Sequence, residues 1–117
     1  MSQSLVTKRA RAFRSQKGKC FYCGIPMWHP SVTDHLFQSI IAEKAMSRIR
    51  CTTEHLQARC DGGSDATENL VAACHFCNQA RHRRASPLGP IEFRKLVMKR
   101  VRAGKWHPAY FHQIYRN

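Results

Sequence analysis

The spacing of apolar residues predicts one helix near the start of the chain and another before its middle. Residues 5–15, LVTKRARAFRS, bring four apolar side chains near one face and leave the basic ones largely elsewhere. Residues 31–49 repeat apolar positions at intervals of three and four, and Ser31 or Thr33 supplies a capping side chain. We therefore expect a short basic helix followed by a second, amphipathic one.

Shorter apolar runs in the middle of the chain predict two strands and then a helix. Residues 49–56, IRCTTEHL, are rich in β-branched residues and alternate in part, and LVAAC at 70–74 suits a brief buried strand. The loop ARCDGGSDATEN lies between them. From His75 the run HFCNQARHRR continues as a helix until the proline and glycine cluster at 86–90. The expected order is strand, loop, strand, helix.

The C-terminal part predicts one more basic helix and an aromatic tail. Pro90 is a favoured first helical position and Gly104 suits a helix stop, so we expect a helix between them. The tail KWHPAYFHQIYRN is aromatic and basic, and it either packs back on the domain or lies against a ligand. Together these elements predict an α+β fold.

Length and charge narrow the class of protein. A chain of 117 residues fits one compact domain, residues 1–117, with a thin core. It has no apolar stretch near the roughly 20 residues of a membrane span and no apolar signal region at its start, so we expect a cytoplasmic protein with no membrane partner. Twenty Lys and Arg against seven acids give a net charge of +13, which predicts nucleic acid as the partner. A solvated basic surface without a specific ligand is the alternative.

Four of the six cysteines form two CxxC pairs, Cys20 with Cys23 and Cys74 with Cys77. Two such pairs complete the tetrahedral four-sulfur set that zinc favours, and a closed set of this kind predicts a structural Zn²⁺. Redox pairs or disulfides are weaker alternatives in a reducing compartment. Cys51 and Cys60 stand outside the pairs and receive no role.

The order of these parts resembles the HNH endonucleases of the ββα-metal type, most closely those with a four-cysteine zinc site. The resemblance rests on Glu54-His55, the Gly62-Gly63 loop, ENLV at 68–71 and CHFCN at 74–78. It spans roughly residues 20–84. It implies a small zinc-braced ββα-metal (HNH) core, flanked by the N-terminal basic helix at about 5–15 and the C-terminal helix and tail at about 90–117.

The resemblance also implies roles for single residues. His55 matches the general base, Glu54 a ligand of the catalytic divalent ion, Asn69 the asparagine that braces the loop and helps orient the base, and Asn78 the third motif position, also an ion ligand. Most zinc-braced members have aspartate where this chain has Glu54. His82, one helical turn after Asn78, is an alternative ligand or a phosphate contact.

The dipeptide Asp34-His35 imitates the start of the motif. It lies in a predicted helix and has no glycine loop after it, so we treat it as a chance likeness.

These features predict a metal-dependent endonuclease that hydrolyses DNA phosphodiester bonds. His55 takes a proton from water, and Mg²⁺ or Mn²⁺ stabilises the phosphate and the leaving oxygen. Phosphate contacts are expected from six basic residues, namely Arg81, Arg83, Arg84, Lys95, Lys99 and Arg100.

No segment presents a base-reading element, so the expected substrate is double-stranded or branched DNA without strong sequence preference. Two alternatives are a non-catalytic zinc-containing nucleic-acid-binding module and a zinc-scaffolded RNA-binding protein. The sequence leaves open nicking versus double-strand cleavage, monomer versus homodimer and the biological pathway, although a bacterial or phage-type context is expected.

Overall fold

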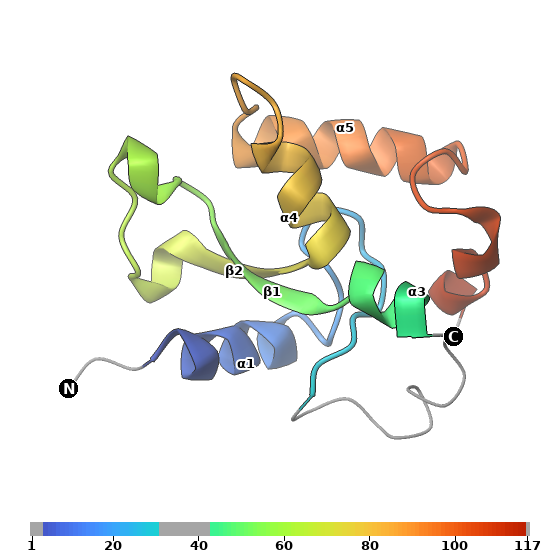
Figure 1. Ribbon diagram of the computed structural model, residues 1–117, viewed down its shortest axis with the longest axis horizontal. Coiled ribbons are helices and arrows are strands. Elements are labelled where there is room, and N and C mark those ends of the chain that lie inside the picture. The colour runs from blue at the N-terminus through green and yellow to red at the C-terminus, as the bar shows by residue number, and fades with distance from the viewer. Residues whose placement is uncertain (1–3, 31–42, 117) are drawn as a thin grey trace.

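The computed structural model describes residues 4–30 and 43–116 (Figure 1). Of the helix predicted over 31–49, the structure describes only the last part, as the short helix α3 at Glu43–Arg48. The two proposed capping residues and the Asp34-His35 pair lie outside the described residues.

A two-stranded hairpin and the helix that follows it form the centre of the molecule. β1 (Cys51–His55) pairs antiparallel with β2 (Leu70–Cys74), in a register that sets Cys51 opposite Cys74 and His55 opposite Leu70. α4 (His75–His82) begins directly after β2. The predicted order of strand, loop, strand and helix is confirmed, and so is the α+β class, with four cysteines clustered in the core.

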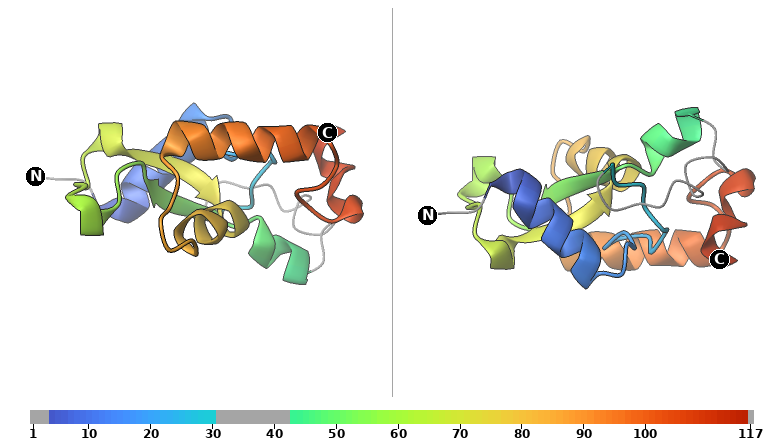
Figure 2. Two further views of the ribbon diagram at one scale, coloured as in Figure 1. Left: turned by 90° about the horizontal axis from the view of Figure 1, so that it is seen from above. Right: turned by 90° about the horizontal axis from the view of Figure 1, so that it is seen from below.

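Two longer helices flank this unit. α1 (Leu5–Ser15) and α4 lie on opposite sides of the hairpin, and α5 (Pro90–Arg102) runs past the far end of α4 (Figures 1 and 2). Gln16, just after α1, ties that helix to β2 because its side chain bonds both the backbone N–H and the carbonyl of Ala72. The helices predicted at 5–15 and after Pro90 are confirmed, and α1 matches its predicted bounds.

Four single turns of 3-10 helix complete the described structure. Two of them, η1 (Arg59–Asp61) and η2 (Thr67–Asn69), lie in the loop between the strands. The other two, η3 (Ala109–Phe111) and η4 (Ile114–Arg116), lie in the tail.

The core surrounds the four paired cysteines. The same core cluster contains aromatic and aliphatic side chains from many parts of the described chain, among them Phe13, Tyr22, Ile49, Phe93 and Phe111. The tail packs back onto this core, as one of the two alternatives expected, because Phe111 is fully buried and Trp106 and Tyr115 lie against the cluster. Among the described residues, no helix has the length and apolar character needed to cross a lipid bilayer.

Candidate metal centre and active site

The four cysteines of the two CxxC pairs meet at one point inside the protein. Their Sγ atoms all lie within 4.8 Å of one another, and all four residues are buried. A tight turn brings the first pair into place: Gly24, with φ of 75°, donates its N–H to the Cys20 carbonyl. The second pair starts α4, where the sulfur of Cys74 accepts the Cys77 N–H and caps the helix.

The cluster fits a zinc ion. Zn–S bonds of about 2.3 Å in a tetrahedron put sulfurs about 3.8 Å apart, and the Cys23 and Cys74 sulfurs are separated by 3.9 Å. Burial raises the pKa of the Cys74 and Cys77 thiols well above the ordinary value. A dication at the centre is therefore what would let four buried sulfurs be thiolates together. The donor set and its burial support a structural ion.

Side chains from the C-terminal tail complete the surroundings of these sulfurs. The Trp106 indole N–H lies 3.3 Å from the Cys77 sulfur, and His107 Nε2 lies 3.3 Å from the Cys23 sulfur. Arg48 donates to His107 Nδ1 at 2.9 Å, so the proton of the neutral ring is on Nε2 and faces the sulfur. Burial, followed by the Arg48 charge, lowers the pKa of His107 to about 4, which keeps the ring neutral.

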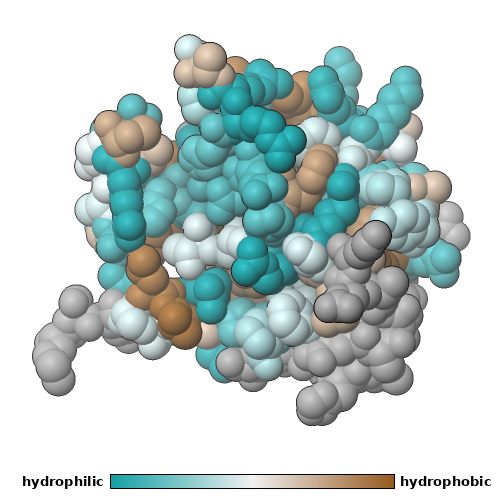
Figure 3. All heavy atoms as spheres, in the orientation of Figure 1, coloured by the Kyte–Doolittle hydropathy of each residue, from teal (hydrophilic) through white to brown (hydrophobic). Residues whose placement is uncertain are grey.

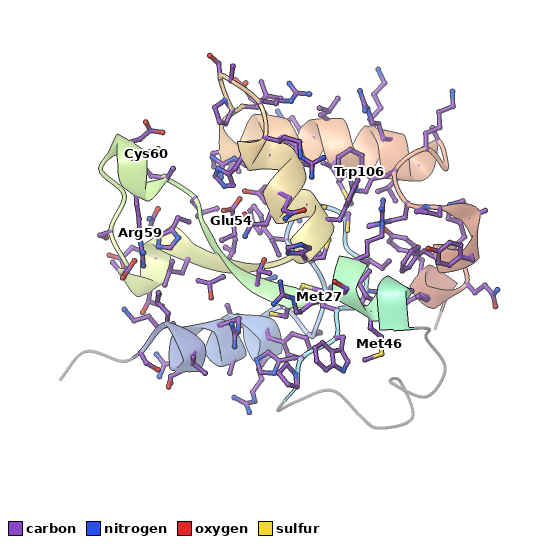
Figure 4. All side chains as sticks on the ribbon, in the orientation of Figure 1. Met27, Met46, Glu54, Arg59, Cys60 and Trp106 are labelled. Atoms are coloured by element: carbon purple, nitrogen blue, oxygen red, sulfur yellow. The ribbon has the colours of Figure 1, made fainter. Side chains whose placement is uncertain are left out.

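Glu54, in β1, is the centre of a second buried cluster. Only 2% of its surface is exposed, and its Oε2 accepts hydrogen bonds from the Tyr22 hydroxyl at 2.9 Å and from Arg81 Nη1 at 3.1 Å. Tyr22 stands between the first two cysteines, and Arg81 follows Cys77 by one helical turn. Both CxxC segments therefore position the same carboxylate oxygen. Figure 4 shows Glu54 beside α4, on the side that faces the inter-strand loop.

The other oxygen of Glu54 faces a histidine. His82 Nε2 lies 2.8 Å from Glu54 Oε1, and the His82 side chain is 32% exposed. Two ligands at right angles on a divalent ion, with bonds near 2.1 Å, lie about 3 Å apart. The 2.8 Å contact is a hydrogen bond, and both atoms are of types that also bind divalent cations.

Asn78 lies one turn before His82 on the same helix. Its Nδ2 donates to the Thr52 hydroxyl at 3.0 Å and to the Thr53 carbonyl at 3.3 Å. In the part of the chain that the structure describes, its Oδ1 takes part in no hydrogen bond. Asn78 therefore retains an oxygen for an ion, although its role as a ligand remains a prediction.

The side chain of His55, the last residue of β1, bonds to the loop between the strands and not to α4. Its Nε2 lies 2.8 Å from Oδ1 of Asp65. Asn69 holds this loop closed: its Nδ2 donates to the carbonyls of Gln57 at 3.1 Å and Ser64 at 2.8 Å, and its Oδ1 accepts the Gln57 N–H at 2.9 Å. This contact pattern agrees with the bracing part of the role predicted for Asn69.

Glu54 and His55 point to different faces of the strand. Neighbouring strand residues alternate in direction, and the partners follow this rule, because Thr52 and Glu54 contact α4 whereas His55 contacts the loop. The described hydrogen bonds do not join the two side chains. β1 ends at His55, where the chain continues into the loop.

The structure divides the six basic residues expected to touch DNA. Arg81 is buried, and its guanidinium donates to Tyr22, Glu54 and the carbonyls of three other residues, namely His55, Leu56 and Leu88. We therefore remove Arg81 from the phosphate-contacting set. The other five are exposed: Arg83, Arg84, Lys95, Lys99 and Arg100. Much of the face drawn in Figure 3 is hydrophilic.

A groove opens beside the Glu54–His82 pair. It has a volume of about 640 Å³ and lies between the start of the inter-strand loop and the link from α4 to α5. Arg84 and His82 supply basic groups to it, and Leu56 and Leu88 supply apolar ones. A polyanion with flat, partly apolar groups suits such a surface.

Sequence reasoning missed Tyr22 and Asp65, which contact the two principal candidates. The sequence does indicate that Tyr22 lies close to the metal centre, because it stands between the two cysteines of the first CxxC pair. Asp65 follows the two glycines of the loop, and nothing in its spacing indicates His55 as its partner.

The comparison with protein families agrees with this geometry. Residues 43–84 match a family model described as HNH endonuclease. The match contains β1, the loop, β2 and α4, whereas Cys20 and Cys23 lie before it. The resemblance to HNH endonucleases is thus confirmed over this segment, and a nuclease-type function on nucleic acid follows in general terms. Neither the curated proteins nor the solved structures that were searched gave a match.

Proposed function

We propose that this protein is a metal-dependent DNA endonuclease. The observation that carries the proposal is the Glu54 Oε1–His82 Nε2 pair, in which a buried carboxylate meets a partly exposed imidazole within the segment that matches HNH endonucleases. Consecutive Cα atoms are about 3.8 Å apart, so the proposal places the scissile phosphate across the end of β1, between His55 and a cation held by the Glu54–His82 pair. The two faces of the strand then serve one substrate.

The residues of this chain divide the work of hydrolysis. His55 accepts the proton of the attacking water. Glu54 and His82 would hold the divalent cation, together with Asn78, and Mg²⁺ or Mn²⁺ would supply Lewis-acid stabilisation of charge on the phosphate and the leaving oxygen. Arg83 and Arg84, both exposed just after α4, neutralise neighbouring phosphates.

The imidazole in the donor set bears on the choice of cation. Mg²⁺ prefers an all-oxygen environment, whereas Mn²⁺ accepts imidazole nitrogen more readily. Because His82 Nε2 faces Glu54 Oε1, we expect Mn²⁺ to support cleavage at lower concentration than Mg²⁺.

Cleavage of supercoiled plasmid tests the proposal. Zinc-loaded protein is incubated with plasmid in EDTA, Mg²⁺ or Mn²⁺, and the same gel separates nicked from linear product. His55→Ala should lose at least about a hundredfold in rate while it retains DNA affinity and zinc. His112→Ala is the matched control, because it lies in the C-terminal tail, a segment that Figure 1 shows on the opposite side of the molecule from the loop between β1 and β2. DNA binding without cleavage in any metal would establish the non-catalytic binding module instead.

A further inference from the structure

We propose that Asp65 is a positioning residue for His55, one that holds the ring with its proton on Nε2 and leaves Nδ1 to accept the proton of water. The proposal rests on the nuclease function proposed above and deepens it. It follows from the contacts of one exposed loop.

The first step is the direction of the hydrogen bond. Asp65 Oδ1 lies 2.8 Å from His55 Nε2. The hydrogen bonds from His55 and Arg59 lower the pKa of the Asp65 carboxyl below its ordinary value, so the group is a carboxylate near neutral pH. A carboxylate only accepts. His55 Nε2 therefore carries the hydrogen, and in the neutral ring Nδ1 bears the lone pair.

The second step is that Nδ1 is left available. In the described part of the chain, the hydrogen bonds of the His55 side chain comprise only the one to Asp65. The His55 side chain is 16% exposed, so the ring is largely covered yet retains contact with solvent. A base needs this combination, because its ring must be fixed and its lone pair must be reachable.

The third step is that the loop fixes Asp65 itself. Arg59 reaches both carboxylate oxygens, at 3.0 Å and 3.1 Å, and Lys8 of α1 donates to the Asp65 carbonyl. Asn69 ties the preceding residue, Ser64, to the base of the loop. Figure 4 shows Arg59 on the loop, beyond the end of the hairpin. Arg59 thus holds the Asp65 carboxylate, while Lys8 and Asn69 hold the backbone at Asp65 and Ser64.

Stability does not account for this arrangement. The Asp65 side chain is 46% exposed and that of Arg59 is 58% exposed, and ion pairs this accessible contribute little to folding. Orientation of the His55 ring explains the Asp65 contact better. Carboxylates orient catalytic histidines in this way in other hydrolases.

The test compares Asp65→Asn with Glu68→Gln in the full, zinc-loaded chain. An amide can present either oxygen or N–H to the ring, so it does not commit the ring to one tautomer. We expect Asp65→Asn to lower kcat by roughly ten- to a hundredfold, with KM for plasmid DNA within about twofold. Glu68→Gln removes the same charge from an exposed side chain of the same loop that makes no hydrogen bond in the described part of the chain, and it should change kcat by less than about threefold. Asp65→Glu should recover part of the loss.

Two measurements separate this inference from the proposed function. ¹⁵N chemical shifts of the His55 ring report its tautomer without any cleavage, and a ring with its proton mainly on Nδ1 would overturn the proposal, even if Asp65→Asn failed to fold. Equal losses in Asp65→Asn and Glu68→Gln would also overturn it. If His55→Ala cleaves like the wild type, the role of His55 as the base fails, whatever the tautomer. If the wild type cleaves in no metal, the nuclease function itself fails. In the His55→Ala background, Asp65→Asn should cause no further loss.

Discussion

The two ends of one short hairpin carry two different kinds of site. At the end where Cys51 faces Cys74, four sulfurs are enclosed by the core and by the tail. At the other end, the side chains of His55 and His82 reach the surface, and the buried Glu54 bonds to His82. The enclosed four-sulfur site leaves no room for a substrate, so it is suited to stabilising the fold. The end with His55 and His82 is open to solvent, so it is suited to chemistry on a substrate.

The comparison also shows how the first end supports the second. Tyr22 belongs to the first CxxC segment and Arg81 to the helix that the second one begins, and both bind Glu54 Oε2. If a metal ion draws the two CxxC segments together, the same event aligns Glu54 so that only its Oε1 is directed at His82. The proposed structural ion would thus affect cleavage without touching DNA.

Loss of one sulfur should have the largest effect. Cys77→Ser leaves three thiolates, and zinc binding in such sites is worth on the order of 10 kcal/mol, comparable with the whole stability of a small domain. We expect an unfolded or zinc-free protein, measured by circular dichroism and by metal content. Cys60→Ser, at an exposed cysteine outside the cluster, is the control and should match the wild type. A folded, zinc-free Cys77→Ser protein would show that the cluster is dispensable.

Removal of the buried arginine should come next. Arg81→Ala takes away the charged partner of a carboxylate that is 2% exposed, and breaking such a buried pair costs about 3–5 kcal/mol. Chemical denaturation should show this loss. Arg83→Ala, at an exposed arginine on the same segment, should stay within about 0.5 kcal/mol of the wild type. Equal stabilities of the two variants would contradict the buried role of Arg81.

The sequence predicted the helices and strands well because their signals are local. The periodicity of LVTKRARAFRS led to α1 with its observed bounds, and LVAAC led to β2. Two CxxC pairs predicted the four-sulfur cluster because each pair brings two thiolates together within a single turn. The helix after His75 ended earlier than expected, at His82, before the proline and glycine cluster.

Contacts between distant segments escaped prediction. In the sequence, Arg81 looks like the other basic residues near the end of α4. Its inward direction is evident only from its bonds to Glu54 and His55 of β1. Asp65 reaches His55 because Asn69 closes the loop, a pairing that depends on the whole loop conformation. The spacing places Arg81 one helical turn after Cys77 and His82 one turn after Asn78. It does not indicate which of Arg81 and His82 faces the core.

His82 allows a finer test of the open end of the hairpin. His82→Ala removes the imidazole from Glu54 Oε1, so the Mn²⁺ concentration that supports half-maximal cleavage should rise at least about tenfold. Folding should change little because the side chain is 32% exposed. His112→Ala should leave the Mn²⁺ requirement unchanged. An unaltered requirement in His82→Ala would leave Asn78 as the better partner of Glu54.

The smallest effect is expected at the closed end. Trp106→Phe keeps the ring between Phe76 and Phe93 but removes the N–H that lies 3.3 Å from the Cys77 sulfur. One hydrogen bond of this kind is worth about 1 kcal/mol, which lowers Tm by roughly 4 °C in a domain of this size. Zinc release to a chelator should quicken a few-fold, because the thiolate loses a donor that stabilises it. Tyr110→Phe, at a side chain that is 60% exposed, should release zinc at the wild-type rate. If both variants release zinc equally fast, the tail covers the cluster without acting on its sulfurs.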